Sequence, residues 1–238
     1  MSPSSGANET TVRGLLLSRV VYGDADFIVH LFTEQLGKIA ALARGARRSQ
    51  KRFGGALEPL HTLVLRVQGR PHVELFTLKE AELSRTRQRV TESLSAMETA
   101  GRALSWVKKS APPHTPEPLV WEALERLLDE LEGPSELDHD SLLASFGVQL
   151  LEGLGWGLEL SRCVSCSKPC RAGQSAWVNP ERGGLICRFC GGGPVLLPGP
   201  LRNLLLELAA KQSFAPLGEH ATLGLKLIER AILAHMGS

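Results

Sequence analysis

All five cysteines of this 238-residue chain lie within one short segment, CVSCSKPCRAGQSAWVNPERGGLICRFC, which spans residues 163–190. Four of them form two C-x-x-C pairs that are separated by twenty residues, and Cys170 lies between the pairs. A C-x-x-C pair in a tight turn delivers two thiolates to one metal ion, and two pairs at this separation match the spacing of a zinc ribbon. We therefore expect one structural Zn²⁺ ion held by four ligands: Cys163, Cys166, Cys187 and Cys190.

Other interpretations of the cysteines fit less well. A thioredoxin-like redox pair needs a βαβ setting, which the surrounding sequence lacks. The spacing matches no iron–sulfur motif, and catalytic zinc sites often use histidine, which is absent between His139 and His220. Since C-x-x-x-C is also an allowed ligand spacing, Cys170 could replace Cys166. The symmetric assignment of the two pairs leaves Cys170 as a free thiol near the site.

A second candidate site is the basic segment ARGARRSQKRFGG, residues 43–55. It places five cations within nine residues and contains no acid; the cations are Arg44, Arg47, Arg48, Lys51 and Arg52. Such a run is often only a solvated loop, but flanking glycines would let it wrap a nucleic-acid backbone. Binding would then be mostly to phosphate, strongly salt-dependent and weakly sequence-specific. Neighbouring strands add further candidate cations: Arg19, Lys38 and Arg66. Tyr22 and Phe53, in nearby turns, are candidates for base stacking.

The overall charge and the absent motifs limit the function classes. The net charge is +2, yet residues 117–140 hold nine acidic residues and a single cation, Arg126. Opposed patches of this kind suggest more than one kind of partner. The sequence has no Walker-type phosphate loop, no nucleophile elbow and no H-E-x-x-H motif. We therefore expect a binding protein and not an enzyme.

The ends and the hydropathy of the chain bear on its location. The start, MSPSSGANETT, lacks the basic and apolar parts of a secretory signal. No segment approaches the roughly 18 consecutive apolar residues that a membrane span needs. We expect a cytoplasmic protein without a membrane partner, in a compartment where thiols stay reduced.

The elements that must position these residues change type along the chain. Residues 11–85 contain five short apolar runs divided by turn signals such as Gly23-Asp24 and Leu36-Gly37, which predicts five β-strands. Five strands in this length favour an OB-fold barrel, a fold whose sheet face and loops commonly bind oligonucleotides. We expect residues 1–10 to form a flexible N-terminus and residues 11–85 to form the DNA-binding domain.

Beyond residue 85 apolar residues recur at helical spacing. This predicts a helical domain over residues 86–160 and 194–238, with the cysteine module, residues 161–193, inserted into it. One helix is expected to turn five leucines inward: Leu119, Leu124, Leu127, Leu128 and Leu131. The next helix is expected to have Asp140 or Ser141 as its N-cap. The predicted fold class is α+β multidomain: a five-stranded OB-fold barrel, then a helical domain with an inserted zinc-ribbon-like module.

The order of these features resembles the bacterial RecO recombination mediators. The segment VVYGDADFIVHLFTEQLGKIAALARGARR, followed by LEPLHTLVLRV and AEL, is similar to the family's start: an apolar strand, an acidic turn, a strand pair and a basic loop. LLEGLGWGLELSRCVSC, followed by GGLICRFC, is similar to its cysteine region, although Trp156-Gly157 replaces an apolar-x-Pro-like segment. The resemblance covers nearly the whole chain, and its specificity lies in the order of loose motifs.

The resemblance implies a DNA repair protein of the RecF pathway that binds single- and double-stranded DNA and anneals complementary strands. It implies that RecR is a partner in loading RecA onto strands coated by single-strand-binding protein (SSB). It also implies contact with the acidic, apolar C-terminal tail of SSB, for which grooves between the C-terminal helices are candidates. Such a protein works in the cytoplasm at the nucleoid. Carried over by position, the DNA contacts are Lys38, Arg44, Arg47, Arg48, Lys51 and Arg52.

Two other function classes stay open from the sequence. One is a zinc-ribbon module that binds nucleic acid or protein without annealing activity, with the acidic helix around Glu125 and Glu130 as its working surface. The other is a metalloenzyme that uses Cys170 or an open metal position.

Overall fold

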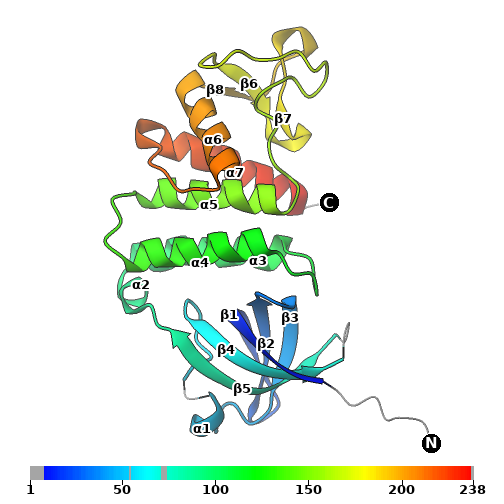
Figure 1. The fold of residues 1–238 in the computed structure, drawn as a ribbon, viewed down its shortest axis with the longest axis vertical. Helices are drawn as coiled ribbons and strands as arrows, with labels where there is room; N and C mark the ends of the chain where they lie inside the picture. Colours follow the sequence, from blue (N-terminus) through cyan, green and yellow to red (C-terminus); the bar gives the residue numbers. More distant parts are fainter. Residues whose placement is uncertain (1–7, 54, 71–73, 237–238) are drawn as a thin grey trace, which may run out of the picture.

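The computed structural model describes residues 8–53, 55–70 and 74–236. A β-barrel lies at one end of the molecule, helices form the middle, and a small sheet lies at the other end (Figure 1). The barrel strands are β1 (Asn8–Tyr22), β2 (Asp26–Thr33), β3 (Gly37–Ala43), β4 (Thr62–Gly69) and β5 (Phe76–Arg85). A one-turn helix, α1 (Gln50–Phe53), lies between β3 and β4.

The five strands close into a barrel in the order β1-β2-β3-β5-β4. β1 is long enough to serve two neighbours: residues 8–15 pair with β4, and residues 14–22 pair with β2. The β3–β5 pair is parallel and all other pairs are antiparallel. This arrangement is that of the five-stranded OB barrel and confirms the predicted fold class. β1 begins at Asn8, before the expected start at residue 11, and residues 1–7 lie outside the described residues.

Alternating residues of the strands fill the barrel, as the period of two requires. The barrel core includes Val29, Leu31, Ile39, Leu63 and Leu65, all at most 2% exposed. Leu15 and Phe32 instead join the core of the helices, and the Phe32 ring lies 5.9 Å from the Trp121 ring. The barrel therefore packs directly on the helical domain.

The helical domain consists of α2 (Gln88–Glu92), α3 (Leu94–Ser110), α4 (Pro118–Glu132), α5 (His139–Gly153), α6 (Gly199–Lys211) and α7 (Ala221–Met236). α5 is buried at its centre and contacts α3, α4, α6 and α7. Four of the five leucines expected to face inward are buried, but the prediction is wrong for Leu119, which is 40% exposed in the first turn of α4.

The N-cap of α5 is Asp138, so the expected cap at Asp140 or Ser141 is wrong. The Asp138 carboxylate accepts hydrogen bonds from the backbone N–H of Ser141 at 2.8 Å and from its hydroxyl at 2.6 Å. The Ser141 hydroxyl oxygen in turn accepts from the N–H of Leu217 at 2.9 Å. The cap therefore links the start of α5 to the segment that leads into α7.

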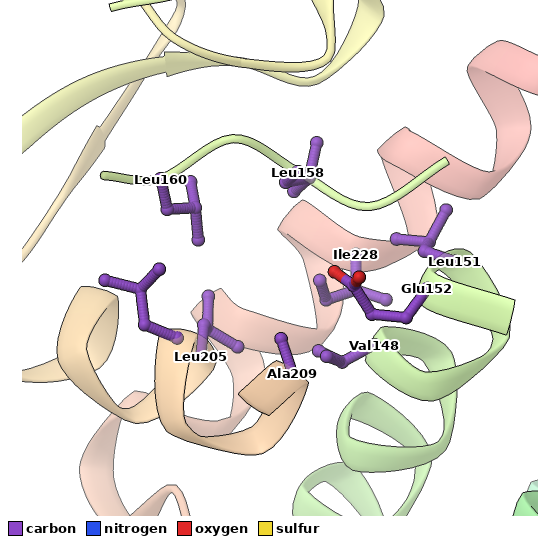
Figure 2. A pocket seen from close by; sticks show the side chains of 9 residues that line it. Val148, Leu151, Glu152, Leu158, Leu160, Leu205, Ala209 and Ile228 are labelled. Atoms are coloured by element: carbon purple, nitrogen blue, oxygen red, sulfur yellow. The ribbon is translucent and has the colours of Figure 1, made fainter. Parts of the chain in front are cut away.

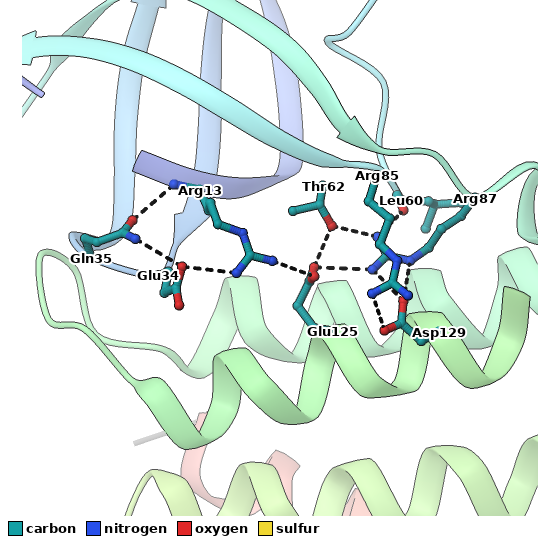
Figure 3. Close-up of polar contacts among 9 residues, drawn as sticks. All are labelled: Arg13, Glu34, Gln35, Leu60, Thr62, Arg85, Arg87, Glu125 and Asp129. Carbon is teal, nitrogen blue, oxygen red and sulfur yellow. Dashed lines mark hydrogen bonds and ion pairs between the residues drawn. The ribbon is translucent and has the colours of Figure 1, made fainter. Parts of the chain in front are cut away.

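A buried arginine joins the barrel to the helices (Figure 3). The Arg87 side chain is 0% exposed and lies between the two domains. It donates to the Leu60 carbonyl at 3.2 Å, to Thr62 Oγ1 at 2.9 Å and to Asp129 Oδ1 at 2.9 Å. Its Nη2 also lies 3.4 Å from Glu125 Oε1. Because both carboxylates belong to α4, this cluster holds the end of the barrel chain against that helix.

The cysteine module contains a small sheet of β6 (Ala176–Asn179), β7 (Gly184–Leu185) and β8 (Val195–Leu197), in the order β7-β6-β8. Two 3₁₀ turns, η1 (Pro180–Arg182) and η2 (Arg188–Cys190), lie in the same segment, and a third, η3 (Gly218–His220), precedes α7. The module's own buried cluster contains only Cys163, Ala176 and Leu185, with three other cysteines packed against it. A cluster this small needs further support.

Part of that support comes from Arg202 in α6, which is 1% exposed. It donates to the carbonyls of Leu160 at 2.7 Å and Gln174 at 3.0 Å, and also to the carbonyl of Arg171. These three carbonyls belong to the segment that carries the first cysteine pair. One buried guanidinium therefore fixes the module to the helical domain.

Candidate nucleic-acid surface and metal centre

The basic loop, residues 44–52, leaves the end of β3 and is held in a defined shape. Asp26 Oδ1 accepts a hydrogen bond from the N–H of Gly45 at 2.7 Å, and the Ala25 carbonyl accepts from the N–H of Arg47 at 3.0 Å. The N–H groups of Arg48 and Ser49 both donate to the Gly45 carbonyl. These bonds place the loop beside the turn between β1 and β2, at the end of the barrel away from the helices (Figure 1).

The cations of the basic loop keep their charge available. Arg44, Arg47, Arg48 and Arg52 are exposed. Arg47 donates to the Asp24 carbonyl at 3.1 Å and Arg52 donates to the Arg44 carbonyl at 2.7 Å, so both are oriented by neutral oxygens. Within the described residues none of the four forms an ion pair with a carboxylate. The structure thus brings these cations together; Lys51 lies in α1, and its side chain is outside those described.

A groove of about 300 Å³ runs under this loop and is lined in part by Arg19, Phe27, Arg47 and Ser49. The Arg19 guanidinium lies 5.4 Å from the Phe27 ring and donates to Glu58 Oε1 at 2.7 Å. Arg19 therefore joins the loop cations at one surface, although an exposed acid partly offsets its charge.

Lys38 and Arg66 do not join this surface. Lys38 lies at the opposite end of β3 from the basic loop, where its Nζ donates to the Lys108 carbonyl at 2.8 Å. Burial, with the Lys108 charge, lowers the Lys38 pKa. Arg66 forms ion pairs of 2.9 Å with both Glu9 and Glu80. Both cations therefore already interact with oxygens of the protein, Lys38 with a carbonyl and Arg66 with two carboxylates.

The two residues expected to stack on bases differ in exposure. Tyr22 is 55% exposed at the end of β1 and stays available. The prediction is wrong for Phe53, which is 2% exposed and packs into the barrel core, with the Arg52 guanidinium 5.1 Å from its ring centroid. The sequence suggests that Phe53 lies in an exposed turn, whereas in the structure it lies in α1, which folds back onto the barrel and buries the ring.

The four paired cysteines come together at the other end of the molecule. All their Sγ atoms lie within 4.8 Å of one another, and the Sγ atoms of Cys166 and Cys187 are 3.7 Å apart. Four thiolates around Zn²⁺ at about 2.3 Å give sulfur separations of about 3.8 Å. The separations are too long for a disulfide, whose S–S bond is about 2.05 Å. The cluster therefore has the donors and the spacing of a site that could hold a metal ion.

The thiols of this cluster differ in acidity. The pKa of Cys163 is lowered to about 6, chiefly because the backbone N–H of Cys187 donates to its sulfur at 3.3 Å. The pKa of Cys190 is raised to about 12, chiefly because its thiol is hydrogen-bonded to the sulfurs of Cys187 and Cys166. Thiols this close oppose each other's ionisation, and a divalent cation between them would remove that opposition.

Cys170 does not belong to this cluster. Its Sγ lies 3.9 Å from both the Arg171 carbonyl and Gln174 Oε1. The two C-x-x-C turns instead orient the clustered sulfurs: the N–H of Ser167 donates to the Cys163 carbonyl at 2.8 Å, and that of Cys190 donates to the Cys187 carbonyl at 2.9 Å.

A small apolar pocket lies between α5, α6 and α7 (Figure 2). Its volume is about 20 Å³, enough for little more than one water molecule. Its one charged lining residue is Glu152, whose pKa is raised by burial. A Cβ at residue 157 would clash with the Glu152 carboxylate, so close packing explains why a glycine occupies this position. The pocket is too small, and carries the wrong charge, for an acidic peptide tail.

Two buried cations and one exposed aromatic are residues that we did not predict. Arg87 and Arg202 bind partners that are distant in sequence, and their local sequences share no signal: Arg87 lies in the polar stretch SRTRQR, and Arg202 lies in an apolar helix segment. Phe189 is 90% exposed inside the second C-x-x-C pair, a position that the spacing alone predicts to face away from the metal.

Across the described ranges, no helix is both long and apolar enough to span a bilayer.

Comparison with known proteins agrees with the geometry. The family model "Recombination protein O N terminal" matches residues 7–87, and "Recombination protein O C terminal" matches residues 92–236. A DNA repair protein RecO from Anaeromyxobacter sp. (strain K) is 34% identical over 85% of this chain and 83% of its own length. One from Rubrobacter xylanophilus is 33% identical over 94% of this chain and 89% of its own length. The chain belongs to the RecO family of DNA repair proteins.

Proposed function

We propose that this RecO protein is a non-enzymatic mediator that binds single- and double-stranded DNA and anneals complementary strands. The observation that carries the proposal is the basic loop, which holds exposed cations without a carboxylate partner among the described residues. Phosphates would supply the missing anions, and the release of their counterions would drive binding.

Annealing follows from charge neutralisation. Two single strands repel each other through their phosphates, and a basic surface that contacts both lowers this repulsion so that bases can pair. Arg44, Arg47, Arg48, Lys51 and Arg52 would make the main contacts, with Arg19 at the edge of the groove. Lys38 and Arg66 would contribute less, since each would first have to leave a protein partner.

We further propose that the protein acts at the nucleoid with RecR to load RecA onto SSB-coated single strands. Membership of the RecO family supports this role. The small pocket between α5, α6 and α7 does not suit the acidic SSB tail, so that contact requires another surface. An annealing assay with SSB-coated oligonucleotides, with and without RecR, tests the role. No annealing under any condition would favour the alternative of a zinc-ribbon interaction module.

We also propose that the cysteine cluster holds one structural Zn²⁺ ion through Cys163, Cys166, Cys187 and Cys190. The ion would supply folding energy to a module that buries little apolar surface of its own. It would have four protein ligands and no open position, which fits a structural and not a catalytic site.

The test of DNA binding is the double variant Arg44→Ala/Arg48→Ala. Both side chains are exposed and free of ion pairs within the described residues, so the fold should be unaffected. We expect weaker binding to oligonucleotides of any sequence, and a salt slope that falls by about 0.7 per lost contact on single strands. Fluorescence anisotropy across a salt series measures both quantities.

The matched control is Lys211→Ala/Lys226→Ala, which removes two exposed cations from α6 and α7. We expect its affinity and salt slope to stay near those of the unaltered protein. An equal loss in both double variants would show that binding follows net charge and not the basic loop, which would contradict the proposal.

A further inference from the structure

The outer face of the cysteine module combines an exposed aromatic ring with unpaired cations. Phe189 lies between Arg188 and Cys190 in the second C-x-x-C turn and is 90% exposed. In such a turn the sulfurs point inward, so the two intervening side chains point outward. The Lys168 ammonium, two residues after the first C-x-x-C pair, lies 4.9 Å from the Phe189 ring centroid. A cation at this distance is attracted to the ring, and the ring stays largely open to solvent.

Charge on the cysteine module is strongly one-sided. Residues 161–193 carry five cations and one acid, Glu181. Glu181 is already 3.4 Å from Arg230 of α7, and the cation Arg162 pairs with Glu159 at 3.3 Å. The remaining exposed cations form no ion pair with a carboxylate in the described ranges: Lys168, Arg171, Arg182 and Arg188. The module therefore carries an excess of positive charge that its own acid does not balance.

A groove of about 430 Å³ opens beside the ring. Trp177 and Ile186 contribute apolar surface to it, while Lys168, Arg188 and Phe189 line it as well. Leu196, 49% exposed, adds a further apolar contact. Flat apolar surface next to unpaired cations is what a single strand recognises, since its bases stack and its phosphates need counter-charges.

The geometry points to a second single-stranded nucleic-acid site on the cysteine module, in which a base stacks on Phe189 and phosphates contact Lys168 and Arg188. This inference rests on the proposed DNA-binding function and extends it to a surface separate from the basic loop. The two surfaces lie at opposite ends of the molecule (Figure 1). One protein would thus hold two separate stretches of single strand.

The test uses the full chain with its metal and an oligonucleotide that carries 5-iododeoxyuridine, which crosslinks to aromatic side chains under light. We expect crosslinked peptides from two places: the strand end that contains Tyr22, which is 55% exposed beside the basic loop, and the segment that contains Phe189. Phe189→Ala should abolish only the second crosslink, and Phe189→Trp should restore it. In the Arg44→Ala/Arg48→Ala background, Phe189→Ala should lower affinity a further roughly five- to hundredfold.

Leu94→Ala is the matched control, because Leu94 is 69% exposed on α3, away from the module. It should leave both crosslinks and the affinity unchanged, and metal content and thermal unfolding should be the same in all variants. A crosslink at Tyr22 beside the basic loop without one at the module would overturn this inference and leave the proposed function standing. No crosslink at either surface would instead contradict the proposed function. Binding of an acidic, leucine-containing peptide at Phe189 in place of the oligonucleotide would also overturn the inference.

Discussion

At the scale of single residues, Cys166 and Cys170 are four positions apart and occupy different surroundings. Cys166 Sγ lies 3.7 Å from Cys187 Sγ inside the cysteine cluster. Cys170 Sγ lies at 3.9 Å from two oxygens outside it. A thiol that faces only oxygen acceptors adds nothing to a tetrahedral sulfur site that already has four donors.

We therefore predict that Cys166→Ser removes the bound metal, whereas Cys170→Ser keeps one zinc ion per chain. Serine is similar in size but is a much poorer ligand for zinc, so the first change leaves three thiolates and the second leaves four. Elemental analysis of the purified variants measures the metal content. The two variants control for each other, and metal loss from Cys170→Ser alone would contradict the assignment.

Ion pairing also explains why the cations predicted to contact DNA differ. Arg48 has no carboxylate partner within the described residues, whereas Arg66 lies between Glu9 and Glu80. These acids approach it through strand pairing with β1 and β5. Surface ion pairs are individually weak, but two of them reduce the gain from a new phosphate contact. Availability of charge is therefore set by pairing across the barrel.

At the scale of elements, the N-cap of α5 should make the stability of the protein depend on pH. Burial alone would raise the Asp138 pKa, but hydrogen bonds from the Ser141 hydroxyl and backbone amides outweigh it and lower the pKa from its ordinary value. A lowered acid pKa adds stability above the unfolded-state pKa, and this stability is lost as pH falls through the folded-state value. Asp138→Asn keeps a hydrogen-bond acceptor but has no carboxyl group to protonate. Its free energy of unfolding should therefore fall less in acid than that of the unaltered protein. Urea unfolding at neutral and acidic pH measures this.

Two further variants complete this test. Asp138→Ala removes the cap and should cost about 1 kcal/mol at neutral pH. Asp140→Asn is the control, because within the described residues the Asp140 side chain accepts only from the Thr222 hydroxyl, at 3.0 Å. This variant should keep the acid dependence of the unaltered protein. If Asp138→Asn loses stability in acid as steeply as the unaltered protein, the cap is not the source.

Elements with local signals could be predicted from the sequence, and their partners could not. The alternating strands, the helical repeats and the two cysteine pairs are each encoded within a few residues, so the barrel, the helices and the cysteine module were predicted correctly. The closure of β1 onto β4, the burial of Phe53 and the partners of Lys38 depend on contacts far apart in sequence. The same is true of Arg87 and Arg202, whose carboxylate and carbonyl partners lie many residues away.

At the scale of the whole molecule, the barrel and the helices are joined through Asp129, which binds two arginines of different burial (Figure 3). Arg85 reaches Asp129 Oδ2 at 2.6 Å with a side chain that is 56% exposed. Arg87 reaches Oδ1 at 2.9 Å with a side chain that is 0% exposed. Because the two arginines share one carboxylate and differ in burial, comparing them measures what burial contributes to the ion pair.

We predict that Arg87→Ala destabilises the protein by about 3–5 kcal/mol, because it leaves Glu125 and Asp129 without a buried counter-charge and Thr62 without its donor. Arg85→Ala should cost less than about 1 kcal/mol, since an exposed ion pair contributes little. Differential scanning calorimetry should show the barrel and the helices unfolding separately in Arg87→Ala and together in Arg85→Ala. The basic loop lies at the far end of β3 from this junction, so folded Arg87→Ala should keep its affinity for DNA. Equal destabilisation by the two changes would show that burial of Arg87 does not join the two domains.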